Sequence, residues 1–145
     1  MVDRVLIVCV GNICRSPMAE AVLRHRLGEH RNVVVESAGL AAMVGSPIDP
    51  LAESVLAAHG LSGKSHLARQ IEGTLVASAD IVFTMDKRQR AALLALAPWA
   101  RSKVALLGKW QGDAEIPDPY RQQRPAFERA YQMIDSAIGS WREYL

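Results

Sequence analysis

Cysteine is scarce in this sequence: among 145 residues only Cys9 and Cys14 are cysteines. They lie five positions apart in one segment, which argues against a secreted disulfide framework. Long apolar runs are missing as well. The N-terminal apolar run stops at Gly11 and Asn12, too early for a secretory signal or a membrane span. We therefore expect a cytoplasmic protein that does not insert into a membrane.

An excess of charge of one sign is also missing. Seventeen Lys and Arg residues face fifteen Asp and Glu residues, a formal net charge of +2 without a basic run, so nucleic acid is not an expected partner. No His, Cys and Asp cluster has the spacing of metal ligands, and we expect neither a metal nor another cofactor. Repeats and linkers are absent too, which predicts a single domain over residues 1–145, expected to be a monomer.

Strand and helix patterns alternate along the chain. Short β-branched or apolar runs predict strands at 5–8, 33–35, 81–83 and 104–107. Periodicity, prolines and glycines predict helices at 17–27, 50–59, 71–77, 87–97 and 125–144. This alternation predicts an α/β fold with a four-stranded parallel sheet and helices on both faces. Such sheets bind ligands at the carboxyl ends of the strands, where Cys9 and the loop around Asp118 both belong.

The segment 9–17, with the sequence CVGNICRSP, joins the first predicted strand to the first predicted helix. A loop of this length can curl around a tetrahedral anion, so we predict a phosphate-binding loop there. Arg15 offers a planar fork to two phosphate oxygens. The residues expected to bind the phosphate through the loop and the helix start are Val10, Gly11, Asn12, Ile13, Cys14 and Ser16.

Cys9 and Asp118 are the predicted reacting groups. The helix start, the loop amides and Arg15 favour the thiolate form of Cys9, which is then a nucleophile toward phosphorus. A tyrosine oxygen leaves with difficulty unless it is protonated, because the phenol has a pKa of about 10. Asp118 lies in a stiff Pro-Asp-Pro turn and is the expected general acid for that step.

These motifs together resemble the low-molecular-weight protein tyrosine phosphatases. The resemblance rests on Cys-x5-Arg-Ser near the N-terminus, on DPY at 118–120, and on ESAG at 36–39, SHLARQ at 65–70, TMD at 84–86 and EIPDPYR at 115–121. It implies that Cys9 is the nucleophile, Arg15 the phosphate clamp and Asp118 the acid, with hydrogen bonds among Asn12, Ser16, Ser37 and His66 supporting the loop. Leu40 and Tyr120 are expected as walls of the slot for the aromatic ring.

The motifs VGNICRSP and EIPDPYR are most similar to the bacterial branch of the family that is associated with exopolysaccharide export. That resemblance implies a phosphotyrosine protein as substrate, with a tyrosine autokinase as the expected partner. Eukaryotic members often carry a second tyrosine where this sequence has Arg121, so regulation by phosphorylation of a tyrosine pair is not expected.

Other interpretations of the same residues remain open at this point. Cys9 alone could be a small buried apolar residue, Asp118 could serve only its turn, and Cys14 could either fill the loop or react in redox chemistry. An arsenate reductase would need further cysteines. A protein-arginine phosphatase would resemble this chain but carry Thr in place of Ile13. A phosphotyrosine-binding module without catalysis would need neither Cys9 nor Asp118.

Overall fold

The computed structural model describes residues 2–28 and 31–145, so residues 1, 29 and 30 of the predicted domain lie outside the described residues. The strands are β1 (Arg4–Cys9), β2 (Val34–Gly39), β3 (Ile81–Thr84) and β4 (Val104–Leu106). The α-helices are α1 (Arg15–Leu27), α2 (Pro50–Ala58), α3 (Gly73–Ser78), α4 (Lys87–Leu96) and α5 (Arg124–Trp141). Three 3₁₀ turns complete the list: η1 (Pro98–Lys103), η2 (Lys109–Gln111) and η3 (Arg142–Tyr144).

The four strands form one parallel sheet in the order β2-β1-β3-β4, which confirms the predicted fold. Cys9 at the end of β1 pairs in register with Gly39 at the end of β2. On the other side, Val8 pairs with Thr84, the last residue of β3. The carboxyl ends of three strands therefore meet beside Cys9.

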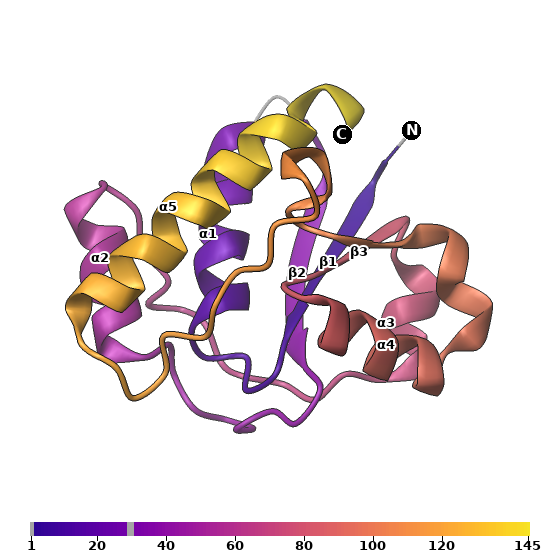
Figure 1. Cartoon of the computed structure of the whole chain (residues 1–145), viewed down its shortest axis with the longest axis horizontal. Coiled ribbons are helices and arrows are strands. Elements are labelled where there is room, and N and C mark those ends of the chain that lie inside the picture. The colour runs from indigo at the N-terminus through magenta and orange to yellow at the C-terminus, as the bar shows by residue number, and fades with distance from the viewer. Residues whose placement is uncertain (1, 29–30) are drawn as a thin grey trace.

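Alternate side chains of β1 face opposite layers of helices. Val5 and Ile7 belong to the core formed with α1, α2 and α5, whereas Leu6 and Val8 belong to the core formed with α3 and α4. Figure 1 shows these two helical layers on opposite sides of the sheet. Burial of β1 on both faces explains why its sequence is an unbroken apolar run.

Several helix boundaries differ from the predicted ones by one to three residues, and two of these differences have a clear structural reason. The helix predicted from residue 71 begins at Gly73, because the Ile71 N–H donates to the Gly39 carbonyl at 2.9 Å and continues a short parallel bridge between Gly39 and Gln70. The last helix ends at Trp141 instead of Tyr144, and the chain tightens there into a 3₁₀ turn. Among the described residues, no helix is both long enough and apolar enough to cross a membrane.

Candidate active site

The loop 9–15 leaves the carboxyl end of β1 and enters α1, which begins at Arg15. Its backbone carbonyls are turned outward. Those of Cys9, Val10, Gly11 and Ile13 accept hydrogen bonds from the backbone N–H groups of Leu40, Ala41, Met43 and Asp49, at 2.8–3.0 Å. The Asn12 carbonyl accepts a bond from His66 Nε2 at 2.6 Å, and the Cys14 carbonyl accepts the first bond of α1 from Met18.

This outward pattern has a direct electrostatic consequence. A peptide unit points its N–H away from its C=O, so tying the carbonyls to the surrounding chain leaves the loop amides facing the loop centre. Within the described part of the chain, no backbone acceptor is bonded to the amides of residues 10–14. A ring of free amides next to a helix start is a binding site for an anion.

Asn12 fixes the shape of the loop from inside the protein. Its backbone is left-handed, with φ of 58°, a conformation that asparagine tolerates better than most residues. The fully buried Asn12 amide donates to Ser16 Oγ at 2.7 Å and to Ser37 Oγ at 3.0 Å. Its Oδ1 accepts the backbone N–H of Arg69 at 2.9 Å. The structure thus brings Asn12, Ser16, Ser37 and His66 into one hydrogen-bonded network.

The two cysteines of the loop have different surroundings. The Cys9 Sγ lies 2.8 Å from the Ser16 Oγ, and Ser16 already accepts a bond from Asn12, which leaves its hydroxyl hydrogen free to donate to sulfur. Among residues 2–28 and 31–145, no such donor reaches the Cys14 sulfur. Burial raises the pKa of the Cys14 thiol far above its ordinary value, and the nearby Asp49 carboxylate raises it further. Cys14 therefore stays a neutral thiol at physiological pH.

Arg15 is held behind the loop by groups from two distant segments. Its Nη1 donates to the Ile116 carbonyl at 2.9 Å and lies 3.5 Å from Asp86 Oδ2. Its Nη2 lies 3.6 Å from Asp118 Oδ2. With a side chain only 4% exposed, Arg15 has lost most of its freedom before any ligand binds.

Asp118 belongs to the segment 115–121, which is hydrogen-bonded to the end of the sheet at its start and lies on the surface further along. The Ile116 N–H donates to the Met85 carbonyl at 3.0 Å, just after β3. Further along, the Tyr120 N–H donates to Asp118 Oδ1 at 3.0 Å and closes a turn, while the Asp118 side chain remains 49% exposed. The carboxylate is thus at the rim, in contact with Arg15 and with solvent.

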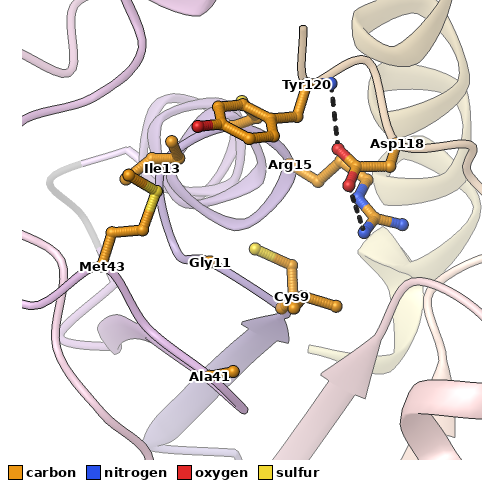
Figure 2. A pocket seen from close by; sticks show the side chains of 10 residues that line it. Cys9, Gly11, Ile13, Arg15, Ala41, Met43, Asp118 and Tyr120 are labelled. Atoms are coloured by element: carbon orange, nitrogen blue, oxygen red, sulfur yellow. Dashed lines mark hydrogen bonds and ion pairs between the residues drawn. The ribbon is translucent and has the colours of Figure 1, made fainter.

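Cys9, Arg15 and Asp118 line one cleft with a volume of about 200 Å³. Figure 2 shows the Cys9 thiol pointing into it, with Ile13 and Met43 on one side, Arg15 and Asp118 on the other, and the Tyr120 ring between them. Besides these residues, the lining consists of Val10, Gly11, Cys14 and Ala41. The predicted wall residue Tyr120 is present in the lining.

Leu40 does not line the cleft as predicted. Its side chain packs against the apolar core on the α3 and α4 side of the sheet, and the adjacent residues Ala41 and Met43 line the cleft instead. No sequence pattern indicates this orientation, because a segment without helix or strand has no periodicity from which to infer which way a side chain faces.

Sequence reasoning also missed the residues that support the site from behind. Gly39 must be glycine: a Cβ there would lie 2.5 Å from the Val10 carbonyl. Gln70 holds the segment after Gly39, since it accepts from the Ala42 N–H and donates to the Leu40 carbonyl. Asp86 caps α4 through the Gln89 N–H, and its second oxygen also faces Arg15. Only long-range contacts reveal these roles.

The chain matches the family described as low molecular weight phosphotyrosine protein phosphatase over residues 4–145. It belongs to this family. It is 48% identical to the low molecular weight protein-tyrosine-phosphatase Wzb of Salmonella typhi over 145 residues, which are all of this chain and 95% of the relative. The chain is accordingly a protein-tyrosine-phosphatase, as predicted.

Solved structures agree with this assignment. Vibrio vulnificus Wzb in complex with benzylphosphonate superposes with a TM-score of 0.94 at 41% identity, over 100% of both chains. The YwlE arginine phosphatase from Geobacillus stearothermophilus superposes with a TM-score of 0.90 at 30% identity, over 97% of this chain and 91% of that one. The same scaffold therefore carries two named phosphatase activities.

Proposed function

We propose that this enzyme hydrolyses phosphotyrosine in proteins through a cysteinyl-phosphate intermediate on Cys9. The observation that carries the proposal is the loop 9–15, whose carbonyls are bonded outward while its amides, the Cys9 sulfur and the Arg15 guanidinium share one centre. Such a cradle suits the equatorial oxygens of a transferring phosphoryl group, where charge is greatest in the transition state.

In the first step the Cys9 thiolate attacks phosphorus. A sulfur–phosphorus bond forms while the bond between phosphorus and the tyrosine oxygen breaks, and the departing oxygen takes a proton from Asp118. Arg15 and the loop amides stabilise the oxygens that remain on phosphorus. The Ser16 Oγ lies 2.8 Å from the Cys9 Sγ, and the hydrogen bond that it donates keeps the sulfur in its attacking position and stabilises the thiolate.

In the second step a water molecule replaces the tyrosine. Asp118, now a carboxylate, takes a proton from the water as oxygen attacks phosphorus, the sulfur–phosphorus bond breaks, and inorganic phosphate leaves. The exposure of Asp118 at the rim suits this role, because water reaches it without entering the core. The enzyme returns to its starting state with a thiolate on Cys9 and a proton on Asp118.

The depth of the cleft favours an aromatic substrate. Cys9 lies on the floor, and the apolar side chains of Ile13, Met43 and Tyr120 line the walls above it. With its phosphate at Cys9, the phenyl ring of phosphotyrosine packs between these walls. The short side chain of phosphoserine does not reach the walls and leaves them in contact with water. Ile13 also supports phosphotyrosine over phosphoarginine, since the resemblance associates the arginine branch with Thr at that position.

The proposed protein substrate is a tyrosine autokinase linked to polysaccharide export, in the cytoplasm. Support comes from the similarity to relatives named Wzb, Etp and EpsP and from the motifs of the exopolysaccharide-associated branch. Cys9 and Cys14 are both free thiols. The proposed mechanism needs a reduced Cys9, and a reducing compartment such as the cytoplasm keeps thiols reduced.

Acid quenching during turnover tests the intermediate. Wild-type enzyme is mixed with a phosphotyrosine peptide, and separately with phosphoarginine, then quenched and digested for mass spectrometry. We expect one phosphoryl group on the peptide that contains Cys9, formed from phosphotyrosine far faster than from phosphoarginine. Cys14→Ser should keep the modification and Cys9→Ala should lose it. Turnover without phosphorylated Cys9 would overturn the proposed mechanism.

A further inference from the structure

A second concave surface lies beside β4, separate from the catalytic cleft. It is a groove of about 360 Å³ that runs between the start of α4 and the turn η2, along Val104, Ala105 and Leu106. Three cationic side chains line it: Lys87, Arg90 and Lys109. Asp113 is the single acidic residue of the lining.

The three cations of this groove form no ion pair with the described carboxylates. Within residues 2–28 and 31–145, no carboxylate lies within 4.0 Å of the side-chain nitrogens of Lys87, Arg90 or Lys109. Glu115 comes near Lys87 only through the backbone, where its Oε2 accepts the Lys87 N–H at 2.8 Å. A concave surface with uncompensated charge of one sign concentrates its field on a ligand of the opposite sign.

Two of the three cations are also positioned. Arg90 Nε donates to the Val104 carbonyl at 3.3 Å, so its guanidinium is held against the edge of the sheet. Lys109 Nζ lies 4.8 Å from the centre of the Trp110 ring, at a distance typical of a cation–π contact. An ordered cation gives up less side-chain entropy on binding an anion than a freely moving one.

The groove is close to the catalytic site along the chain. Lys87 directly follows Asp86, whose carboxylate lies 3.5 Å from Arg15. Arg90 is one helical turn further, about 6 Å along α4 from Asp86 at 1.5 Å per residue. An extended peptide advances about 3.3 Å per residue. A substrate with its phosphotyrosine on Cys9 therefore needs only a few flanking residues to bring a second anionic group to the groove.

We propose that this groove, defined by Lys87, Arg90 and Lys109, binds acidic side chains that flank the reacting phosphotyrosine in the protein substrate. This inference rests on the proposed function and adds a substrate class to it: phosphotyrosine within an acidic segment. A protein segment fits better than nucleic acid, because the groove is short, the sequence has no basic run and the net charge is only +2.

Matched peptides and variants test the groove. One phosphotyrosine peptide carries four Glu residues on one flank, and its partner carries Gln at those positions; each flank is tested in turn. The enzymes are wild type, the variant Lys87→Gln/Arg90→Gln/Lys109→Gln, and a control with the same charge change, Arg101→Gln/Arg129→Gln/Arg142→Gln. All three control residues are exposed and lie outside the groove lining.

With wild type we expect kcat/KM for the Glu peptide to exceed that for the Gln peptide by about tenfold at low salt, the sum of three modest ion pairs. The preference should fall to below about twofold in the groove variant and at ~0.5 M salt, and should persist in the control variant. Turnover of para-nitrophenyl phosphate should be equal in all three enzymes. Equal use of both peptides by wild type, or equal losses in both variants, would overturn the proposal.

A binding measurement keeps this test separate from catalysis. The Glu peptide without phosphotyrosine is titrated into wild-type enzyme, and the backbone amide signals of residues 87–90 and 109 are followed by NMR. Selective shifts at these residues support the groove even if no phosphotyrosine peptide is hydrolysed, an outcome that would instead refute the proposed function. A single-stranded oligonucleotide that shifts the same signals at lower concentration than the peptide would overturn the protein assignment.

Discussion

The loop 9–15 and the segment 115–121 both reach the catalytic cleft, but they are held in opposite ways. Every carbonyl from Cys9 to Cys14 has a hydrogen-bond donor, and Asn12 and Arg15 are buried beneath the loop. In the segment 115–121, Ile116 is anchored to Met85 and Arg15, but the bonds that follow it are made within the segment or near it.

This difference matches the two tasks in the proposed mechanism. A cradle for an oxyanion gains most when its dipoles are fixed before the reaction, because no reorganisation is then needed in the transition state. A general acid must exchange its proton with solvent between the two steps. The exposure of Asp118 allows that exchange, while its 3.6 Å contact with Arg15 keeps it beside the cradle.

Cys9→Ser should have the largest effect. A serine hydroxyl in this loop has no adjacent base to ionise it, so turnover should fall below detection. The amides and Arg15 remain, and inorganic phosphate should still bind with an affinity close to that of wild type. Kinetics with para-nitrophenyl phosphate and a phosphate titration check both parts. Continued turnover by this variant would show that the cradle does not supply the nucleophile.

Asn12→Ala should damage the loop itself. It removes three side-chain bonds and leaves the buried hydroxyls of Ser16 and Ser37 and the partly buried Arg69 N–H without their partner. We expect the free energy of unfolding to fall by about 3 kcal/mol and kcat/KM by ten- to a hundredfold. Denaturant unfolding and steady-state kinetics measure these changes. Asn32→Ala, at an exposed position, is the control and should change neither.

Asp86→Asn separates charge from helix capping. The amide oxygen can still cap α4 through the Gln89 N–H, but the negative charge 3.5 Å from Arg15 is lost. We expect a three- to tenfold drop in kcat/KM, because the guanidinium is less well oriented, with little change in stability. Asp3→Asn, on the exposed end of the chain before β1, should be silent. An unchanged kcat/KM would mean that the cradle orients Arg15 without Asp86.

Alkylation should distinguish the two thiols of the loop while changing the stability of the fold least. Because burial raises the pKa of the Cys14 thiol, the reactive thiolate of Cys14 should be absent at neutral pH and appear only in strongly alkaline solution. Limited iodoacetamide at pH 7 should therefore modify Cys9 and spare Cys14, with inactivation in step with Cys9 labelling and protection by phosphate. Peptide mass spectrometry reads both sites; early labelling of Cys14 would contradict its burial.

The sequence was sufficient to predict the parts of the molecule that local patterns determine. The strand 5–8 is apolar because both faces of β1 are buried, and the segment 9–17 shows its chemistry because Cys9, Arg15 and Ser16 are neighbours in the chain. Even the start of α5 is set locally, by the proline at its first turn.

What could not be predicted depends on contacts between distant residues. Leu40 and Met43 lie in a segment without helix or strand, and their orientation follows from backbone bonds to Cys9 and Gly11. Asp86 approaches Arg15 only because β1 and β3 are neighbours in the sheet. The requirement for glycine at position 39 likewise arises from a close approach to the Val10 carbonyl.

The most direct test that loop 9–15 binds the phosphate while Asp118 donates the proton is to measure Asp118→Ala on substrates with different leaving groups. The substitution leaves the loop 9–15 intact, so thiolate attack should survive and only proton donation should be lost. Phenyl phosphate and phosphotyrosine should lose on the order of 10²–10⁴-fold in rate, whereas aryl phosphates with strongly electron-poor rings should lose far less.

Rates for wild type and Asp118→Ala are to be plotted against the pKa of the leaving phenol, with Asp113→Ala as a control that should follow wild type. We expect a clearly steeper line for Asp118→Ala, because the departing oxygen must then leave without a proton. Parallel lines would contradict proton donation by Asp118: it would then help every substrate equally, as a positioning residue does, and another group would have to donate the proton.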